Sequence, residues 1–274
     1  MLEKPGNKRL TRNRTVDVLL LLLLILFAGL ILFSGRKLSE SRKEYEAGDA
    51  VYASLASTLI HSEAPSVSSA AASSVFIAAS SEMAEEEPEM TVDFESLKAI
   101  NDQIVGWICS DTGIIDYPVL HGKDNSYYLD HLPDGTYNKN GSIFVDCRNL
   151  PLFGDRNTII YGHNMRTGTM FGELVEYGND GYYEEHPTLQ LITPDGSFEL
   201  QIFSGYVTSG NSDIYRLTFE DDTDFTAYLE RIRSLSDFST DVEVTAQDKI
   251  ITLSTCTYDY EDARYVVHCK LVPA

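Results

Sequence analysis

One uninterrupted apolar run stands near the start of the chain, at residues 18–33, and its sixteen residues carry no charge. With its flanks it approaches the length of about 20 residues that crosses a bilayer. Five basic residues precede it within the first 14 positions, and the positive-inside rule places such an N-terminus in the cytoplasm. This pattern predicts a cytoplasmic basic tail at 1–15 and a single-pass signal anchor at 16–35, with the rest of the chain outside the cell. A cleaved signal peptide is the competing interpretation, although no small-residue cleavage site adjoins the run.

The segment that follows is polar. A loose helical spacing of larger side chains marks its first part, at Tyr45, Tyr52, Leu55 and Leu59. Residues 62–90 are mostly Ser, Ala and Glu, a composition that buries too little apolar surface to fold. We therefore expect a juxtamembrane stalk and flexible spacer at 36–90, and a folded domain at 91–274.

Beyond residue 91 the hydrophobic pattern becomes that of a β protein. Short runs rich in β-branched and aromatic residues, separated by turn residues, lie at 105–110, 115–122, 141–147, 157–164, 189–209, 249–256 and 264–272. The sequence TPDGS at 193–197 divides the longest run into a hairpin. Seven or eight short strands at this spacing predict an all-β barrel or sandwich.

Two helices are predicted beside these strands. The first covers residues 94–100, with Asp93 as its N-cap. The second covers about 219–237, where apolar side chains recur at helical spacing and acidic residues in the first turn suit the helix dipole. This long helix directly precedes the strand at 249–256.

Charge and cysteine content narrow the chemistry. The net charge is −21, and because residues 1–43 hold nine Lys and Arg against three acids, the remainder carries −27. A domain so acidic repels nucleic acid, which excludes DNA and RNA as partners. The four cysteines show no CxxC spacing and no disulfide framework: Cys109, Cys147, Cys256 and Cys269. A thiol retained outside the membrane is therefore a candidate for chemistry.

Residues 249–272 predict a hairpin that separates two of these thiols. Alternation places Cys256 at the end of one strand and Arg264 at the start of the next, on the same face. Cys269 faces the other way and lies about five residues, or roughly 16 Å, along from Cys256. This separation argues against a disulfide between them, since a disulfide needs Cα atoms within about 7 Å. A thiol beside a guanidinium is a candidate nucleophile, provided that an acid/base is near.

Among six histidines, His163 has the most suggestive context. It follows an apolar strand at 157–161 and precedes a Gly-containing loop, and strand ends commonly present catalytic side chains. His268 alternates within a strand and belongs either to the core or to the barrel surface. A zinc site using His121 and His131 lacks the HExxH or CxxC spacing of known zinc motifs.

Taken together, the motifs TLSTC at 252–256, Arg264 eight residues later and YGHNM at 161–165 resemble those of the sortases. These are membrane-anchored cysteine transpeptidases of Gram-positive bacteria. The sequences NDQIVGWI, YPVL, DNSYYL and GSIFVD before the histidine, and the long helix before the cysteine strand, resemble class B. The resemblance spans residues 92–272 and implies a closed eight-stranded β-barrel.

The resemblance also implies roles for individual residues. Cys256 would be the nucleophile, His163 the general acid/base and Arg264 the oxyanion or substrate-positioning group. The substrate-binding residues would be Ser254, Thr257 and Tyr215, with the Thr257 backbone N–H as a second oxyanion donor. No cofactor or metal is implied, and the acidic residues show no EF-hand pattern.

The implied reaction cleaves a C-terminal sorting motif of NPxTN or xPxTG type after Thr, through a thioester. The expected partners are surface proteins that carry this sorting signal and an amine of peptidoglycan or its lipid-linked precursor. Two alternatives remain at this point. One is a pilin-polymerising sortase that uses a pilin Lys as acceptor, and the other is an inactive barrel that serves as a binding or scaffold module.

Overall fold

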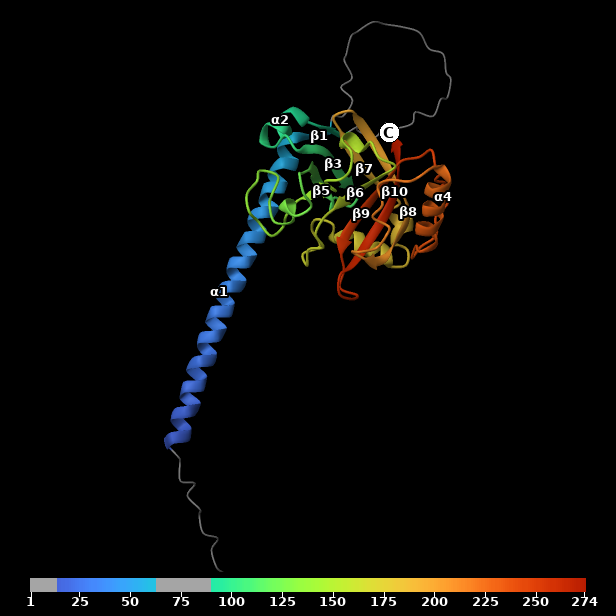
Figure 1. Ribbon diagram of the computed structural model, residues 1–274. Coiled ribbons are helices and arrows are strands. Elements are labelled where there is room, and N and C mark those ends of the chain that lie inside the picture. The colour runs from blue at the N-terminus through green and yellow to red at the C-terminus, as the bar shows by residue number, and fades with distance from the viewer. Residues whose placement is uncertain (1–13, 63–89) are drawn as a thin grey trace, which may run out of the picture. The chain divides into compact units, whose positions relative to one another are not determined.

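The computed structural model describes residues 14–62 and 90–274 (Figure 1). They fall into two units, the first ending at Ala47 and the second beginning at Gly48. Most of the predicted cytoplasmic tail and most of the predicted Ser/Ala/Glu spacer, residues 1–13 and 63–89, lie outside the described residues.

The first unit is the N-terminal part of helix α1 (Arg14–Leu59). Within the described residues, α1 contains the one helix segment that is long and apolar enough to cross a membrane, with a mean hydropathy of 3.0. Its large apolar side chains from Val18 to Phe33 are exposed. This agrees with the predicted membrane anchor.

The second unit starts with the last turns of α1, a segment that the sequence predicts as part of a separate stalk. Tyr52 is 4% exposed, and its hydroxyl donates a hydrogen bond to the Gly141 carbonyl. Its ring packs edge-on against Tyr117 at 5.0 Å between centroids. Leu55 is buried with Trp107 and Leu97. The compact unit therefore begins well before residue 91, because these side chains complete an apolar surface of the barrel.

Eight strands close into a barrel, as predicted. They are β3 (Ile104–Ser110), β4 (Asp116–His121), β5 (Ile143–Val145), β6 (Asn157–Tyr161), β7 (Thr188–Thr193), β8 (Gly196–Ser209), β9 (Ile250–Cys256) and β10 (Ala263–Pro273). Their order around the barrel is β10-β8-β7-β3-β4-β5-β6-β9. The β4–β5 and β6–β9 pairs are parallel and the others antiparallel. Closure leaves no free edge strand in the barrel.

The remaining elements are short, apart from α4. They are β1 (Ile60–Ser62), paired with β2 (Met90–Val92), the helices α2 (Phe94–Ile100), α3 (Tyr182–Glu185) and α4 (Asp222–Ser234), and the 3₁₀ helices η1 (Tyr127–Leu129), η2 (Pro151–Phe153) and η3 (Gly172–Gly178). Asp93 caps α2 as predicted, accepting a hydrogen bond from the Ser96 amide at 3.0 Å. Helix α4 is shorter than the predicted 219–237 and is capped by Asp221.

Alternation along β9 and β10 sorts their side chains between two cores. Leu253, Val267 and Cys269 belong to the cluster that fills the barrel. Ile250 and Val266 point outward and pack with Phe225 and other residues of α4. In Figure 1, α4 lies over the outer side of the barrel beside β8. The cysteine strand is thus buried on both faces until its last residue, which emerges at the rim.

Candidate active site

The site forms where the parallel strands β6 and β9 end side by side. Tyr161 lies opposite Ser254 in the register. Just beyond, the Gly162 amide donates to the Ser254 carbonyl at 3.1 Å, and Thr255 Oγ1 donates to the Gly162 carbonyl at 2.8 Å. A Cβ on Gly162 would lie 2.7 Å from the ring of the buried Phe171, so a larger residue would push this core side chain aside. These contacts bring His163 to the same rim as Cys256.

The β9–β10 hairpin has the predicted register. Cys256 is the direct partner of Arg264, and Cys269 pairs with Ile251. All four cysteines lie in the described residues, and none of them forms a disulfide. Cys269 is fully buried, and burial raises the pKa of its thiol far above the ordinary range. Cys256, by contrast, is partly exposed at the strand end.

One pocket of about 340 Å³ collects most of the predicted site residues. Its lining residues are Asn125, Leu129, Phe144, Tyr161, Gly162, His163, Gly210, Tyr215, Ser254, Thr255, Cys256 and Arg264. All three residues predicted as catalytic belong to it, together with Ser254 and Tyr215. Thr257 does not.

Hydrogen bonds fix the orientation of the imidazole and of its strand. His163 Nε2 lies 2.6 Å from the Leu129 carbonyl oxygen. Because a carbonyl can only accept, Nε2 carries the hydrogen, and a neutral ring then has its lone pair on Nδ1. The next residue, Asn164, donates from Nδ2 to the Cys256 carbonyl at 2.9 Å. The loop that carries His163 is therefore hydrogen-bonded directly to strand β9, which carries Cys256.

The guanidinium of Arg264 is held from its own chain. Its Nη1 donates to the Ala263 carbonyl at 3.0 Å, and its Nη2 forms an ion pair with Asp262 at 2.9 Å. A guanidinium has five N–H groups, so these contacts leave donors for a substrate oxygen in the pocket.

The Thr257 backbone N–H, expected as a second oxyanion donor, is engaged within the hairpin in this structure. It donates to the Ala263 carbonyl at 3.1 Å, which closes the loop between β9 and β10. To donate to a substrate oxyanion, the Thr257 N–H would first have to release this bond. The Thr257 hydroxyl is also engaged, donating to Asp259 at 2.6 Å.

Tyr215 and Ser254 meet in the pocket as a pair. The two hydroxyl oxygens are 2.9 Å apart, and burial raises the pKa of Tyr215, while the Ser254 bond opposes that rise. Tyr215 therefore stays protonated at neutral pH. Tyr215 lines the pocket, and its contact with a substrate stays a prediction.

Two further pocket residues lie in the GSIFVD and YGHNM motifs, but the motifs alone do not place them at the site. Phe144 and Tyr161 are cross-strand partners on β5 and β6, which only the strand pairing could reveal. The Tyr161 hydroxyl donates to Asp146 at 2.9 Å, and Arg148 pairs with the same carboxylate at 2.7 Å. Burial opposes ionisation, but Arg148 and the hydrogen bonds outweigh it and lower the pKa of Asp146 to about 2. This charged pair holds one wall of the pocket.

The sequence did not decide whether His268 belongs to the core or to the barrel surface. In the structure it is buried between the barrel and α4. Its ring nitrogens lie 3.0 Å from Thr252 Oγ1 and 3.2 Å from the Tyr206 hydroxyl. Burial lowers its pKa to about 3, so the ring is neutral. His268 is a core residue, away from the pocket of Cys256.

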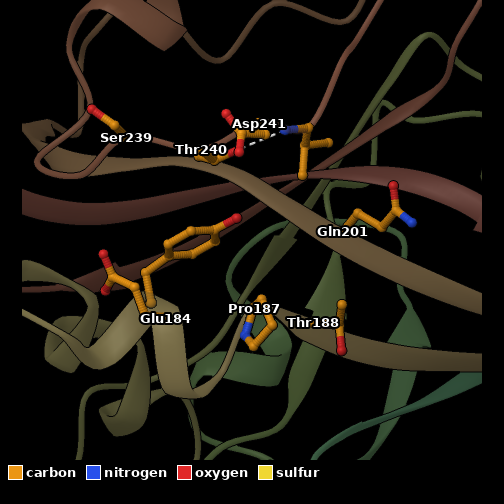
Figure 2. A pocket seen from close by; sticks show the side chains of 9 residues that line it. Glu184, Pro187, Thr188, Gln201, Ser239, Thr240 and Asp241 are labelled. Atoms are coloured by element: carbon orange, nitrogen blue, oxygen red, sulfur yellow. Dashed lines mark hydrogen bonds between the residues drawn. The ribbon is translucent and has the colours of Figure 1, made fainter.

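A larger pocket of about 480 Å³ lies elsewhere on the barrel unit. Figure 2 shows Glu184, Pro187 and Thr188 on one side of it and Ser239, Thr240 and Asp241 on the other. It shares no residue with the Cys256 pocket, and its lining contains neither histidine nor cysteine. The chemistry of a nucleophile paired with a base is therefore confined to the smaller pocket among those described.

Comparisons with known proteins agree with this geometry. The family model of the sortase domain matches residues 110–272. Sortase B of Listeria monocytogenes is 40% identical over 186 residues, which cover 67% of this chain and 76% of that protein. Sortase B of Staphylococcus aureus is 38% identical over 192 residues, which cover 69% of this chain and 79% of that protein.

Solved structures give the same result. A complex of Staphylococcus aureus sortase B with a substrate matches with a TM-score of 0.63 at 39% identity, covering 66% of this chain and 85% of that one. Clostridium perfringens sortase B matches with a TM-score of 0.63 at 34% identity, covering 66% of this chain and all of that one. The eight-stranded barrel, the paired strand ends and these relatives lead to one conclusion: the chain belongs to the sortase family, as a class B sortase and hence a cysteine transpeptidase.

Proposed function

We propose that this enzyme uses Cys256, His163 and Arg264 to cleave a C-terminal sorting motif of NPxTN or xPxTG type after its Thr. It then transfers the cleaved protein to an amine of peptidoglycan or of its lipid-linked precursor. The observation that carries this proposal is that these three side chains, from β9, the end of β6 and β10, line one pocket with Ser254 and Tyr215.

In the first half-reaction the Cys256 thiolate attacks the Thr carbonyl carbon, and the carbonyl oxygen becomes an oxyanion. Arg264 donates hydrogen bonds to that oxygen, and stabilising it at this stage lowers the barrier. With the Thr257 N–H held by Ala263, the guanidinium carries more of this task. His163 protonates the leaving amine as the C–N bond breaks, which leaves a thioester on Cys256.

The hydrogen bond made by His163 supports Nδ1 as the nitrogen that transfers the proton. Its Nε2–H is directed to the Leu129 carbonyl, so Nδ1 gives the proton to the leaving amine. In the second half-reaction Nδ1 accepts a proton from the incoming amine as that amine attacks the thioester. The new amide bond forms, and Cys256 leaves as the thiolate.

The proposed topology fits this task. Residues 16–35 of α1 anchor the protein in the membrane with residues 1–15 in the cytoplasm, and the catalytic unit, which begins at Gly48 and so before the predicted boundary at residue 91, lies outside. The Lys and Arg bias before the apolar run supports this orientation. Surface proteins that carry a sorting signal emerge from the same membrane, within reach of the pocket.

The test is a panel of fluorogenic peptides with NPxTN-type and xPxTG-type motifs, incubated with the detergent-solubilised full chain. Each reaction is run with and without an amine acceptor. We expect one motif class to be cleaved after Thr and joined to the amine, and the Cys256→Ala variant to be inactive. If no peptide is cleaved, or if Cys256→Ala cleaves as well as the native chain, the proposal fails.

A further inference from the structure

The residue two positions before Arg264 has an unusual backbone. Asp262 has a φ of 62°, in the left-handed region that few residues other than Gly, Asn and Asp adopt readily. This conformation ends the loop between β9 and β10 and turns the Asp262 carboxylate toward the guanidinium of Arg264. The two groups form an ion pair of 2.9 Å.

Asp262 is itself fixed by the opposite loop of the pocket. Its carbonyl accepts a hydrogen bond from the Gly210 amide at 2.9 Å, and its carboxylate accepts one from Asn211 Nδ2 at 3.2 Å. A Cβ on Gly210 would lie 2.8 Å from both carboxylate oxygens. The absence of a side chain at Gly210 thus leaves room for the carboxylate, and Gly210 also lines the pocket of Cys256.

This arrangement is poorly explained as a device for stability. The side chains of Arg264 and Asp262 are 30% and 40% exposed, and ion pairs so open to solvent contribute little to folding. The ion pair instead orients the guanidinium of Arg264. A long, flexible arginine side chain gains a fixed direction when the Ala263 carbonyl and the Asp262 carboxylate both hold its guanidinium.

We propose that Asp262 is a positioning residue for the transpeptidation reaction, holding the guanidinium of Arg264 in place at the Cys256 pocket. The inference rests on the proposed role of Arg264 as the oxyanion group. Small displacements of a catalytic group are costly, because the rate depends on pre-set geometry. Asp262 acts through Arg264 and does not touch the substrate.

The same loop supplies a matched control. Asp259 accepts its hydrogen bond from the Thr257 hydroxyl at 2.6 Å. The variants Asp262→Gly and Asp259→Gly each replace one carboxylate of this loop by glycine, and glycine tolerates the φ of 62° at position 262. A general effect of loop charge or flexibility would therefore appear in both.

The experiment measures kcat and KM of the full chain in detergent with a cleavable sorting peptide. We expect Asp262→Gly to lower kcat by about tenfold with KM within about twofold, and Asp259→Gly to stay within about twofold in both. The variant Arg264→Lys lacks the planar guanidinium. In that background, Asp262→Gly should lower kcat by a further factor of less than about two.

Two results would overturn the inference. One is an Asp262→Gly variant as active as Asp259→Gly. The other is a loss that persists undiminished in the Arg264→Lys background, because Asp262 would then act through the loop and not through the guanidinium. If Arg264→Ala is inactive, either result refutes the role of Asp262 alone. If Arg264→Ala is fully active, the proposed role of Arg264 itself is refuted.

Discussion

A single buried hydroxyl beneath α4 offers a quantitative test of how the pocket wall is supported. Tyr228 is 5% exposed, donates to the Ile214 carbonyl at 2.7 Å, and accepts from Asn157 Nδ2 at 3.2 Å. Asn157 also donates to the Arg216 carbonyl at 2.9 Å. These bonds hold the residues on both sides of Tyr215, so the variant Tyr228→Phe should loosen that wall.

The expected cost follows from the groups left without a partner. Tyr228→Phe leaves the Ile214 carbonyl unsatisfied and removes one of two acceptors from Asn157 Nδ2. An unsatisfied buried polar group costs about 1–3 kcal/mol, so we expect the free energy of unfolding to fall by about 2 kcal/mol. For a domain of this size that corresponds to a Tm lower by roughly 4–8 °C.

The assay is thermal unfolding of a soluble chain that begins at Gly48, together with peptide-cleavage kinetics. Tyr258→Phe is the matched control, because Tyr258 is 74% exposed in the β9–β10 loop and should leave Tm unchanged. For Tyr228→Phe we also expect KM to rise more than kcat falls, since Tyr215 is a proposed substrate contact and not part of the chemistry. A Tm equal to that of the control would refute this account of the wall.

Three further outcomes follow from the structure. Arg264→Ala should lower kcat by about 100- to 1,000-fold with KM nearly unchanged, as loss of an oxyanion donor does; an equal loss confined to KM would contradict this role. His268 has a folded pKa of about 3, below its unfolded value of about 6.5, so the unfolded state binds the extra proton and Tm should fall as pH drops from about 6.5 toward 3. In His268→Gln that fall should be weaker, and an unchanged Tm-against-pH curve would count against a neutral buried ring. Deletion of Glu261 should impair activity more than stability, with a large fall in kcat and a small fall in Tm, because the length of the β9–β10 loop sets the pairing of Cys256 with Arg264. An unchanged kcat would show that this register is not required.

The fold could be predicted from the sequence where burial depends on alternation. A shift of one residue in β9 or β10 would turn every side chain to the other face, so the apolar positions around Cys256 and Arg264 defined one register, which the structure confirms. The packing of α1 could not be predicted in this way. The spacing of Tyr52 and Leu55 was visible, but their partners, such as Gly141, come from a distant part of the chain.

The candidate site likewise has a part that the sequence pattern predicts and a part that it does not. Side chains at strand ends could be located, because the strands carry them: Cys256, His163 and Arg264 all line the pocket. The backbone of the β9–β10 loop could not, because the left-handed conformation of Asp262 and the bond between Thr257 and Ala263 depend on contacts that no pattern records. The role of the Thr257 N–H as an oxyanion donor stays a prediction, because this bond would have to open when a substrate binds.

The central claim is that Cys256 carries the cleaved protein as a thioester. Intact mass spectrometry of the full chain, mixed with a cleavable sorting peptide without an amine acceptor, tests it directly. We expect an adduct equal in mass to the peptide up to its Thr, mapped to Cys256 by proteolysis and removed by hydroxylamine. The Cys256→Ala variant should show neither adduct nor cleavage. Cleavage without an adduct, or an adduct on the partly exposed Cys147, would contradict the account.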